Sequence, residues 1–598
     1  MKDFIKHTLA TVVGIFLFGI ITCILMLMSI VGMMASNSQT KTIDDNSVLV
    51  IKLKGIIDDK TNDEGNPLAT LLGEEVETQG LYNLVEAIKR AKQSDEIKGI
   101  YIEAGAISAD PATITALRDA LKDFKKSKKF IVAYADQYSQ GSYYISSVAD
   151  KVWVNPLGMV ALHGMGTQPR YVRDFLAKVG IKMQVVKVGQ YKSATETYTE
   201  DHMSDANREQ VTAYMTGIWN HMLKGIAESR KLSVDTLNAY ADRVMDLAST
   251  ETLKKNKLID GTLYTDQVKG EVKKLLKIDD DDDISQVSVA QMLQTKSGSS
   301  SSDNQIAIYF CEGTIVQQPT EVYLMGGGST IIGNNVCKDL ESLAKDDDVK
   351  AVVIRINSGG GDAYASEQMW HQIMELKKVK PVVISMGGLA ASGGYYMSCG
   401  ATWIVAEPTT ITGSIGIFGT FADISNLMTQ KLGFKYDEVK TNRNATMSVT
   451  PMARPFTSEE LNLLQGYIDR GYTLFRKRVA DGRHLKVEDV EKIAQGRVWL
   501  GKDAIGIKLV DQLGSLKDAV DMAAKFAKVK DDDFYTSTYP AAESWTDNLL
   551  KQATGGGNYL DAQFKDVLGE YYEPFMLMKT IRQQSPVQAR MMESIKIN

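Results

Sequence analysis

The sequence is poor in the residues that build disulfide scaffolds and metal centres. It holds four cysteines and six histidines among 598 residues. No two cysteines have the C-x-x-C spacing, and the histidines show no paired ligand spacing. These absences argue against a disulfide framework and against a zinc site, so we expect no metal ion and no cofactor held by such residues.

A surplus of basic residues is also absent. The formal net charge is −6, with 68 Lys and Arg against 74 Asp and Glu. Nothing in this balance favours a nucleic-acid partner. The length exceeds that of one ordinary domain. Without its N-terminal segment the chain leaves two units of about 250 residues, each large enough for a full core.

What is present begins with an apolar N-terminal run. Residues 8–35 carry no charge, Lys2 and Lys6 precede them, and Asp44 and Asp45 follow. A membrane-spanning helix needs about 20 residues, and this run is longer than the apolar core of a cleaved signal peptide. The positive-inside rule therefore predicts a single-pass anchor in the inner (cytoplasmic) membrane. The N-terminus would be cytoplasmic and the bulk of the chain periplasmic or otherwise extracytoplasmic.

The rest of the chain is a tandem repeat. Residues 381–398 (PVVISMGGLAASGGYYMS) align with residues 129–146 (KFIVAYADQYSQGSYYIS), so that Tyr395 matches Tyr143 at an offset of 252. Both halves alternate continuous apolar strands with helices, which is typical of parallel α/β sheets. The repeat predicts two α/β units with the same fold.

We expect five segments along the chain. They are a cytoplasmic N-terminus with the anchor at 1–45, a first repeat at 46–278, an acidic and Ser/Gly linker at 279–303, a second repeat at 304–530 and a helical tail at 531–598. The linker joins an aspartate run to the stretch KSGSSSSD, a composition that is typical of a flexible connector. The sequence assigns no role to the tail.

The two repeats have lost different residues. On the 252 register Ser392 faces Gln140, and Lys192 faces Asn444. One half therefore keeps a serine without the lysine, and the other keeps a lysine without the serine. This pattern is expected if the two copies share a single Ser/Lys site.

The surroundings of the serine suit nucleophilic catalysis. Ser392 lies in the stretch AASGG, and the glycine-rich stretch Asn357–Asp362 (NSGGGD) follows another strand, so both can direct backbone amides at an oxyanion. The first-half counterpart Gly105–Asp110 has lost the triple glycine. Neither motif contains histidine, and the G-x-S-x-G elbow is absent. Lys192, in a small and weakly charged stretch, can act as the base if burial makes it neutral.

These segments resemble a known family. The stretches NSGGGDAYASE, SMGGLAASGGYYMS, TGSIGIFG, GQYKSATE and GRVWLGKDAIGIKLVDQLG are similar to those of the signal peptide peptidase A (protease IV) family in its long, duplicated form. The resemblance implies a crotonase/Clp-protease-like fold in each half, a Ser–Lys dyad divided between the halves and a bowl-shaped homotetramer.

The same resemblance assigns roles by motif. It makes Ser392 the nucleophile, Lys192 the general base, Gly360 and Gly393 the oxyanion amides, and Ser414 the residue that orients the lysine. One departure is Gly359, where the family usually has proline. The glycines that shape the loop are kept.

The expected function is that of a membrane-anchored serine endopeptidase that degrades cleaved signal peptides and other short apolar peptides. Its partners would be those peptides, the lipid membrane through residues 8–35, and further copies of the chain, with no metal or organic cofactor. Two alternatives stay open. A crotonase-type acyl-thioester enzyme would bind coenzyme A and would not need the Ser/Lys pairing, and a non-catalytic membrane scaffold would need no dyad at all.

Overall fold

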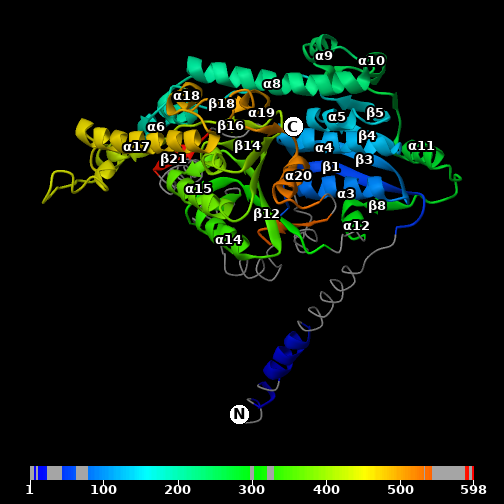
Figure 1. Cartoon of the computed structure of the whole chain (residues 1–598), viewed down its shortest axis with the longest axis horizontal. Coiled ribbons are helices and arrows are strands. Elements are labelled where there is room, and N and C mark those ends of the chain that lie inside the picture. Colours follow the sequence, from blue (N-terminus) through cyan, green and yellow to red (C-terminus); the bar gives the residue numbers. More distant parts are fainter. Residues whose placement is uncertain are drawn as a thin grey trace.

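The computed structural model describes residues 4, 6–8, 11–22, 43–61, 78–295, 302–318, 329–530, 533–541, 586–591 and 596–597. Within these ranges no helix combines the length and the apolar character that crossing a membrane requires. Residues 9, 10 and 23–35 of the predicted anchor, and 542–585 of the predicted tail, lie outside the described residues. The described helical residues 11–22 project from the body of the molecule (Figure 1).

The first half is built on a parallel sheet. The strand order is β2-β1-β3-β4-β5-β7, with β8 beside β1. The strands are β1 (Ser47–Asp58), β2 (Thr78–Gly80), β3 (Ile97–Ala109), β4 (Phe130–Tyr138), β5 (Lys151–Val160), β7 (Gly261–Thr262) and β8 (Gln286–Ser288). Side chains alternate between two apolar clusters, one on each face of this sheet.

Helices cover both faces of the first sheet. One face packs against α3 (Leu81–Gln93), α4 (Pro111–Phe124), α5 (Gln140–Ser146) and the long α8 (Asp205–Arg230). The other face packs against α11 (Thr265–Leu276). This is the arrangement that continuous apolar strands require, because both faces of a parallel sheet must be buried.

The second half repeats this plan. Its main sheet has the order β18-β16-β14-β12-β9-β20, with β15 and β19 beside it. The strands are β9 (Gln305–Glu312), β12 (Val349–Ser358), β14 (Val382–Ala391), β15 (Trp403–Ala406), β16 (Ile411–Gly413), β18 (Val498–Leu500), β19 (Gln512–Leu513) and β20 (Tyr535–Tyr539). The helices are α14 (Gly333–Lys345), α15 (Ala363–Lys377), α16 (Gly393–Ser398), α17 (Ser458–Arg483) and α20 (Leu516–Phe526).

A further sheet joins the two halves. Its order is β11-β10-β13-β21-β17-β6. The strands are β10 (Thr314–Val316), β11 (Thr330–Ile332), β13 (Gly360–Asp362), β17 (Phe418–Asp423) and β21 (Val587–Arg590) from the C-terminal part, and β6 (Lys182–Lys187) from the first half. Strand β6 pairs antiparallel with β17, so the first half reaches onto the second at this sheet.

Two stretches of the described tail are strands, whereas residues 542–585, on which most of the expected helix falls, lie outside the described residues. Strand β20 extends the second sheet at the edge of β9, and β21 lies between β13 and β17. Both segments are short, and their strand form depends on partners that are distant in the sequence. Sequence reasoning that looked for helical periodicity could not find them.

The repeat contains one insertion that the ungapped alignment hides. In β4, Val132 pairs with Lys151, whereas in β14 the residue that pairs with Trp403 is Val383. The offset is therefore 251 within this strand, and it returns to 252 at its end. The extra residue falls near Gly387 and Gly388, which face carboxylates of the first half.

The halves are also joined by a buried ion pair. Arg355 donates to both carboxylate oxygens of Asp59, at 2.9 and 2.8 Å, and both side chains are only 2% exposed. Beside this pair Asn357 donates to Asp110 at 2.9 Å. These polar contacts lie at the carboxyl ends of β12 and β3, next to the glycine-rich loop, so they fix one half against the other close to the predicted site.

Candidate active site

Ser392 stands at a strained turn between β14 and α16. Its backbone has φ 56° and ψ −113°, and its amide donates to the carbonyl of Gly413 at 2.8 Å. A positive φ is unfavourable for a residue with a side chain. Ser392 is the N-cap residue of α16, but its hydroxyl caps no backbone amide. The buried hydroxyl is therefore available to another partner.

That partner comes from the other half of the chain. The Nζ of Lys192 lies 2.7 Å from the Oγ of Ser392. It also lies 3.0 Å from the Oγ and 3.1 Å from the carbonyl oxygen of Ser414. The side chain of Lys192 is 1% exposed, and this burial holds its pKa well below the usual value. A lysine in this state can accept a proton at moderate pH.

The segment that carries Lys192 is held by the second half. The amide of Tyr191 donates to the carbonyl of Gln495 at 3.0 Å. Gly496 makes room for this approach, because a Cβ there would lie 2.7 Å from the Cα of Lys192. From α8, Gln210 donates to the carbonyl of Tyr191 and accepts from the amide of Val498. Gln210 is a positioning residue that no sequence motif signalled.

Ser414 is fixed in its turn by the same region. Its backbone has φ 49°, and its amide donates to the carbonyl of Arg497 at 2.7 Å. The stretch TGSIG, singled out in the sequence, therefore places one hydroxyl and one carbonyl beside the amine of Lys192. This is the position that the resemblance assigned to a lysine-orienting serine.

The glycine-rich loop lies against the start of α16. A Cβ on Gly360 would lie 2.6 Å from the amide nitrogen of Gly393, and Gly360 has φ 95°. Only glycine allows so close an approach with this backbone. The amide of Gly360 donates to the Oγ of Ser358 at 3.1 Å in this structure. At Gly359, the departure from the family pattern, a Cβ would lie 3.1 Å from the side chain of Leu389.

The tail strand β21 runs across these glycines. The amide of Met591 donates to the carbonyl of Gly359 at 2.8 Å, and Gly361 pairs with Ala589 in the antiparallel register. The carbonyl oxygen of Ala589 would lie 2.0 Å from a Cβ on Gly360. A peptide in extended form therefore fits over the loop, with its backbone paired to β13.

The first half has no equivalent of this site. At the start of α5, Gln140, the first residue of that helix, takes the place of the serine. Its Oε1 accepts from the amides of His163 and Gly164, and its Nε2 donates to the carbonyl of Gly164. Asn444, which faces Lys192 on the 252 register, and Ala445, which faces it on the offset of 253 between α8 and α17, both lie in an irregular segment between β17 and α17. The structure thus brings together Ser392, Lys192 and Ser414 and leaves their counterparts apart.

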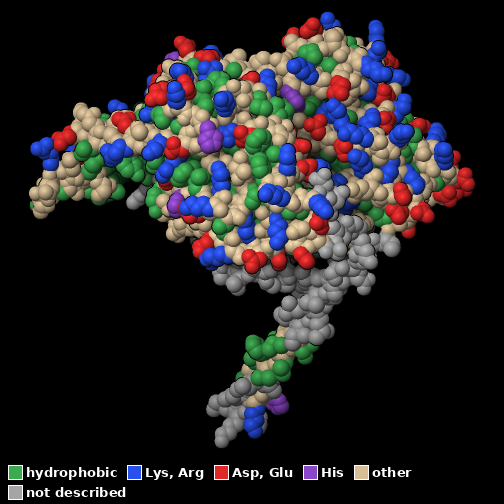
Figure 2. Space-filling model, in the orientation of Figure 1, with side chains coloured by type: hydrophobic (Ala, Val, Ile, Leu, Met, Phe, Trp, Pro, Cys, Tyr) green, Lys and Arg blue, Asp and Glu red, His purple; other side chains and the backbone are tan. Residues whose placement is uncertain are grey.

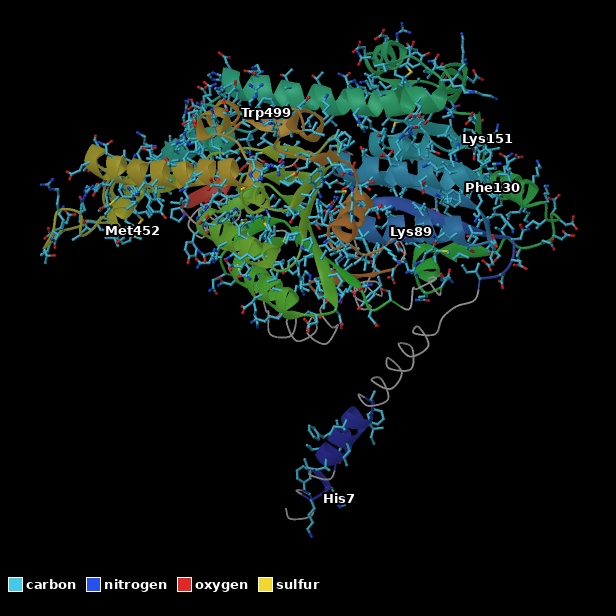
Figure 3. All side chains as sticks on the ribbon, viewed as in Figure 1. His7, Lys89, Phe130, Lys151, Met452 and Trp499 are labelled. Atoms are coloured by element: carbon cyan, nitrogen blue, oxygen red, sulfur yellow. The ribbon has the colours of Figure 1, made fainter. Side chains whose placement is uncertain are left out.

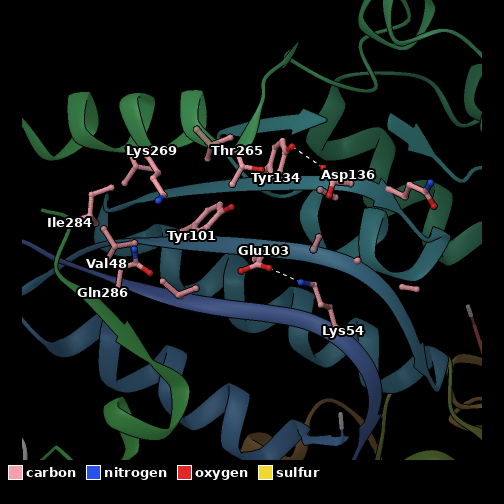
Figure 4. Close-up of a pocket in the computed structure, with 18 residues that line it drawn as sticks. Val48, Lys54, Tyr101, Glu103, Tyr134, Asp136, Thr265, Lys269, Ile284 and Gln286 are labelled. Carbon is pink, nitrogen blue, oxygen red and sulfur yellow. Dashed lines mark hydrogen bonds and ion pairs between the residues drawn. The ribbon is translucent and has the colours of Figure 1, made fainter. Parts of the chain in front are cut away.

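A cavity of about 440 Å³ lies away from the dyad, between the first sheet and α11. Its polar lining includes Lys54 paired with Glu103 at 2.6 Å, and the hydroxyl of Tyr134 donating to Asp136 (Figure 4). It holds no residue of the predicted site. In the described part of the chain, no group of three or more His, Cys, Asp and Glu side chains could hold a metal ion.

Comparison with known proteins agrees with this geometry. The sequence profile of peptidase family S49 matches residues 123–279 and 374–530, and that of the Clp protease family matches residues 313–405. The chain belongs to peptidase family S49. Its two S49 segments are the two halves of the repeat, so this S49 peptidase has a duplicated, Clp-protease-like α/β fold.

Three curated relatives of this S49 peptidase are proteases. "Protease 4" of Haemophilus influenzae is 32% identical over 533 residues, covering 85% of this chain and 84% of the relative. "Protease 4" of Salmonella typhi is 34% identical over 525 residues, with 85% and 82% covered. "Serine protease SPPA, chloroplastic" of Arabidopsis thaliana is 32% identical over 489 residues, with 81% and 69% covered. The chain is a serine peptidase.

Proposed function

We propose that this peptidase is a membrane-anchored endopeptidase in which Ser392 is the nucleophile and Lys192 the general base. The observation that carries the proposal is the 2.7 Å contact between two fully buried side chains from different halves of the chain. A serine needs an adjacent base to become a nucleophile, and among the described residues Lys192 is the titratable group at its hydroxyl.

The reaction follows from this arrangement. Neutral Lys192 takes the proton of Ser392 as its Oγ bonds to the carbonyl carbon of the substrate. The amides of Gly360 and Gly393 stabilise the oxyanion, and Ser414 keeps the amine aimed at Ser392. The bond to the leaving amine breaks as Lys192 returns its proton to that amine. A water molecule, deprotonated by Lys192, then hydrolyses the acyl-enzyme and restores Ser392.

The substrates that suit this site are extended peptides. Strand β21 supports this view, because it pairs with β13 through its backbone while the side chain of Ala589 is fully buried. Backbone pairing gives affinity without regard to sequence, and buried positions select apolar side chains. Signal peptides left in the membrane after cleavage, and other short apolar peptides, have these properties.

The anchor and the assembly belong to the same proposal. Residues 8–35 would hold the chain in the inner membrane, with a cytoplasmic N-terminus and an extracytoplasmic peptidase. In the described part of this run, Ile15, Phe16 and Phe18 are 67 to 72% exposed, which suits contact with lipid (Figure 2). The assembly that we propose is a homotetramer of this chain.

The proposal is tested by hydrolysis of a fluorogenic apolar peptide across pH, comparing the wild type with Ser392→Ala and Lys192→Ala. We expect both substitutions to abolish turnover and the wild-type rate to rise with pH through one deprotonation, because only neutral Lys192 can act as a base. Activity that survives Lys192→Ala would place the base elsewhere. A folded wild type without activity would favour the scaffold alternative.

A further inference from the structure

The repeat extends into a segment that the catalytic site does not explain. Residues 180–187 (GIKMQVVK) correspond to residues 433–440 (GFKYDEVK) at an offset of 253. The helices that follow them, α8 and α17, each have 26 residues and differ by the same offset. The two segments are therefore the same element of the fold in the two halves.

In the first half this element is a docked strand. Residues 182–187 form β6, which pairs antiparallel with β17 of the second half. Val186, opposite Gly419 in this ladder, is 5% exposed and belongs to the core of the second half. The same apolar cluster includes Leu464 and Ile468 of α17, and α17 packs against β6. The side chain of Val186 therefore fills a pocket on the other half of the chain.

In the second half the same element has no strand partner among the described residues. Residues 435–440 form no strand and lie in a segment that projects beyond α17 (Figure 1), with Met452 near its base (Figure 3). Val439, the counterpart of Val186, is 93% exposed, and Phe434 and Tyr436 are 53% and 43% exposed. Three large apolar side chains exposed within six residues of chain are unfavourable in water unless another surface covers them.

The first half has an open pocket at the position that corresponds to the one filled by Val186. A pocket of about 340 Å³ lies on the first half, between residues 165–167 and α8. Its lining includes Val211 and Met215, which are the counterparts of Leu464 and Ile468 at the offset of 253. It also includes Thr167, the counterpart of Gly419 at the offset of 252. This pocket of the first half is therefore the counterpart of the pocket that Val186 fills in the second half.

The segment beside this pocket also has no strand partner among the described residues. Residues 166–171 correspond to β17, but the structure gives them no strand partner within the described ranges. Pro169 stands where β17 has Phe421, so a ladder here would have one amide donor fewer. The valine, the pocket and both strand segments thus occur twice in the chain. Only the pairing of β6 with β17 is made within a single copy.

We propose that Val439 of one copy inserts into this pocket on a second copy, with residues 435–440 pairing antiparallel to residues 166–171 of that copy. The register of β6 and β17, transferred by the repeat offsets, sets Val439 opposite Thr167 and Tyr436 opposite Arg170. Glu438 then lies diagonal to Arg170, a favourable pairing of charges. The partner is a further copy of this chain, because the chain itself carries both complementary surfaces.

This contact determines how copies can assemble. It joins the second half of one copy to the first half of the next, so it is heterologous, and such contacts close into rings when the rotation allows. The cavity beside Lys54 and Glu103 fits the same scheme. It lies on the face of the first sheet whose counterpart, around Phe310, is covered by Tyr82 of the other half. The contact between copies does not depend on the peptidase activity.

A designed disulfide tests the pairing directly. In the full-length chain in detergent, the double variant Thr167→Cys with Val439→Cys is expected to form disulfide-linked multimers on a non-reducing gel, because opposed strand positions are within disulfide reach. Each single variant, and the pair Thr167→Cys with Val379→Cys, should stay monomeric on the gel. Val379 is 65% exposed and serves as the matched control. A ladder that is no stronger for the designed pair would overturn the register.

The role of Val439 in assembly is tested by measuring the mass of the multimer. Light scattering on the detergent-solubilised wild type should give a multimer, and Val439→Asp should shift the mass to that of one copy, whereas Val379→Asp should not. The thermal midpoint of Val439→Asp should match the wild type, since Val439 touches little within its own copy. A wild type that is monomeric at micromolar concentration, or an unchanged mass for Val439→Asp, would refute the proposal. Loss of turnover alone would bear on the proposed function and not on this contact.

Discussion

The turns that begin α5 and α16 occupy the same place in the two halves and carry different strain. At the start of α5, Gln140, the counterpart of Ser392, is not among the residues with positive φ, and the preceding Ser139 has φ −68° and accepts from the amide of Ser142 as a normal cap. Before α16, Ser392 has φ 56° and makes no cap. The first half, which lacks the serine, also lacks the positive φ at this turn. Strain at Ser392 is therefore tied to the presentation of its hydroxyl, and it is not a requirement of the fold.

The largest effect should come from breaking the Ser/Lys pair to which each half contributes one residue. Ser392→Ala and Lys192→Ala should each lower kcat/KM by about 10³-fold or more, and the double variant should be no worse than either single variant, because the two residues act as one unit. Turnover of an apolar peptide measures this.

The first half provides the control. Gln140→Ser in a Ser392→Ala background should restore no activity, because Gln140 faces His163 and Gly164 and no lysine. Recovery of even a small rate would show that the first half retains a working site.

The ion pair of Arg355 should contribute more to stability than the ion pair at the corresponding position of the first half. Arg355 is buried with Asp59, whereas its repeat counterpart Glu103 pairs with Lys54 at side-chain exposures of 34% and 46%. Asp59→Asn leaves a buried, unpaired guanidinium and should lower the free energy of unfolding by about 3–5 kcal/mol. Lys54→Ala should change it by less than about 1 kcal/mol. Urea titration followed by tryptophan fluorescence measures both. Equal effects would mean that the buried pair does not hold the halves together.

The sequence could predict the parts of the site that the repeat records. Ser392, Lys192 and the loop around Gly360 follow from motifs and from complementary losses, because the proposed catalysis restricts which residues can stand there. The partners of Asp59, the strand at Ala589 and the role of Gln210 could not be predicted. They are contacts between distant segments, and neither local periodicity nor composition encodes which distant strand a short segment will meet.

Ser414 offers a smaller test of the comparison. Its counterpart in the first half is Leu162, which is fully buried and has no hydroxyl. Ser414→Ala should lower kcat by about tenfold with little change in KM, because the amine of Lys192 loses one of the groups that aim it at Ser392. The thermal midpoint should stay close to that of the wild type. A change confined to KM would indicate that Ser414 contacts substrate instead.

A buried acid gives the last comparison between the two halves. Burial raises the pKa of Glu407 to about 8, and one of its carboxylate oxygens has no hydrogen-bond partner among the described residues. The repeat counterpart is Asn155, which is neutral at any pH. Because the folded state holds the proton more tightly than the unfolded state, the stability that Glu407 contributes is present below its ordinary pKa of 4.5 and is lost as the pH rises through about 8.

Glu407→Gln should therefore be nearly neutral at pH 5 and stabilising at pH 8.5. A gain on the order of 4 kcal/mol is expected at the higher pH, since the rise of the pKa from 4.5 to about 8 spans roughly 3.5 tenfold changes in proton affinity, each of which corresponds to about 1.4 kcal/mol. Thermal unfolding at the two pH values measures the difference, with Asn155→Gln as the matched control in the other half. A gain of equal size at both pH values would show that the amide improves packing and that the charge of Glu407 is not what destabilises the fold.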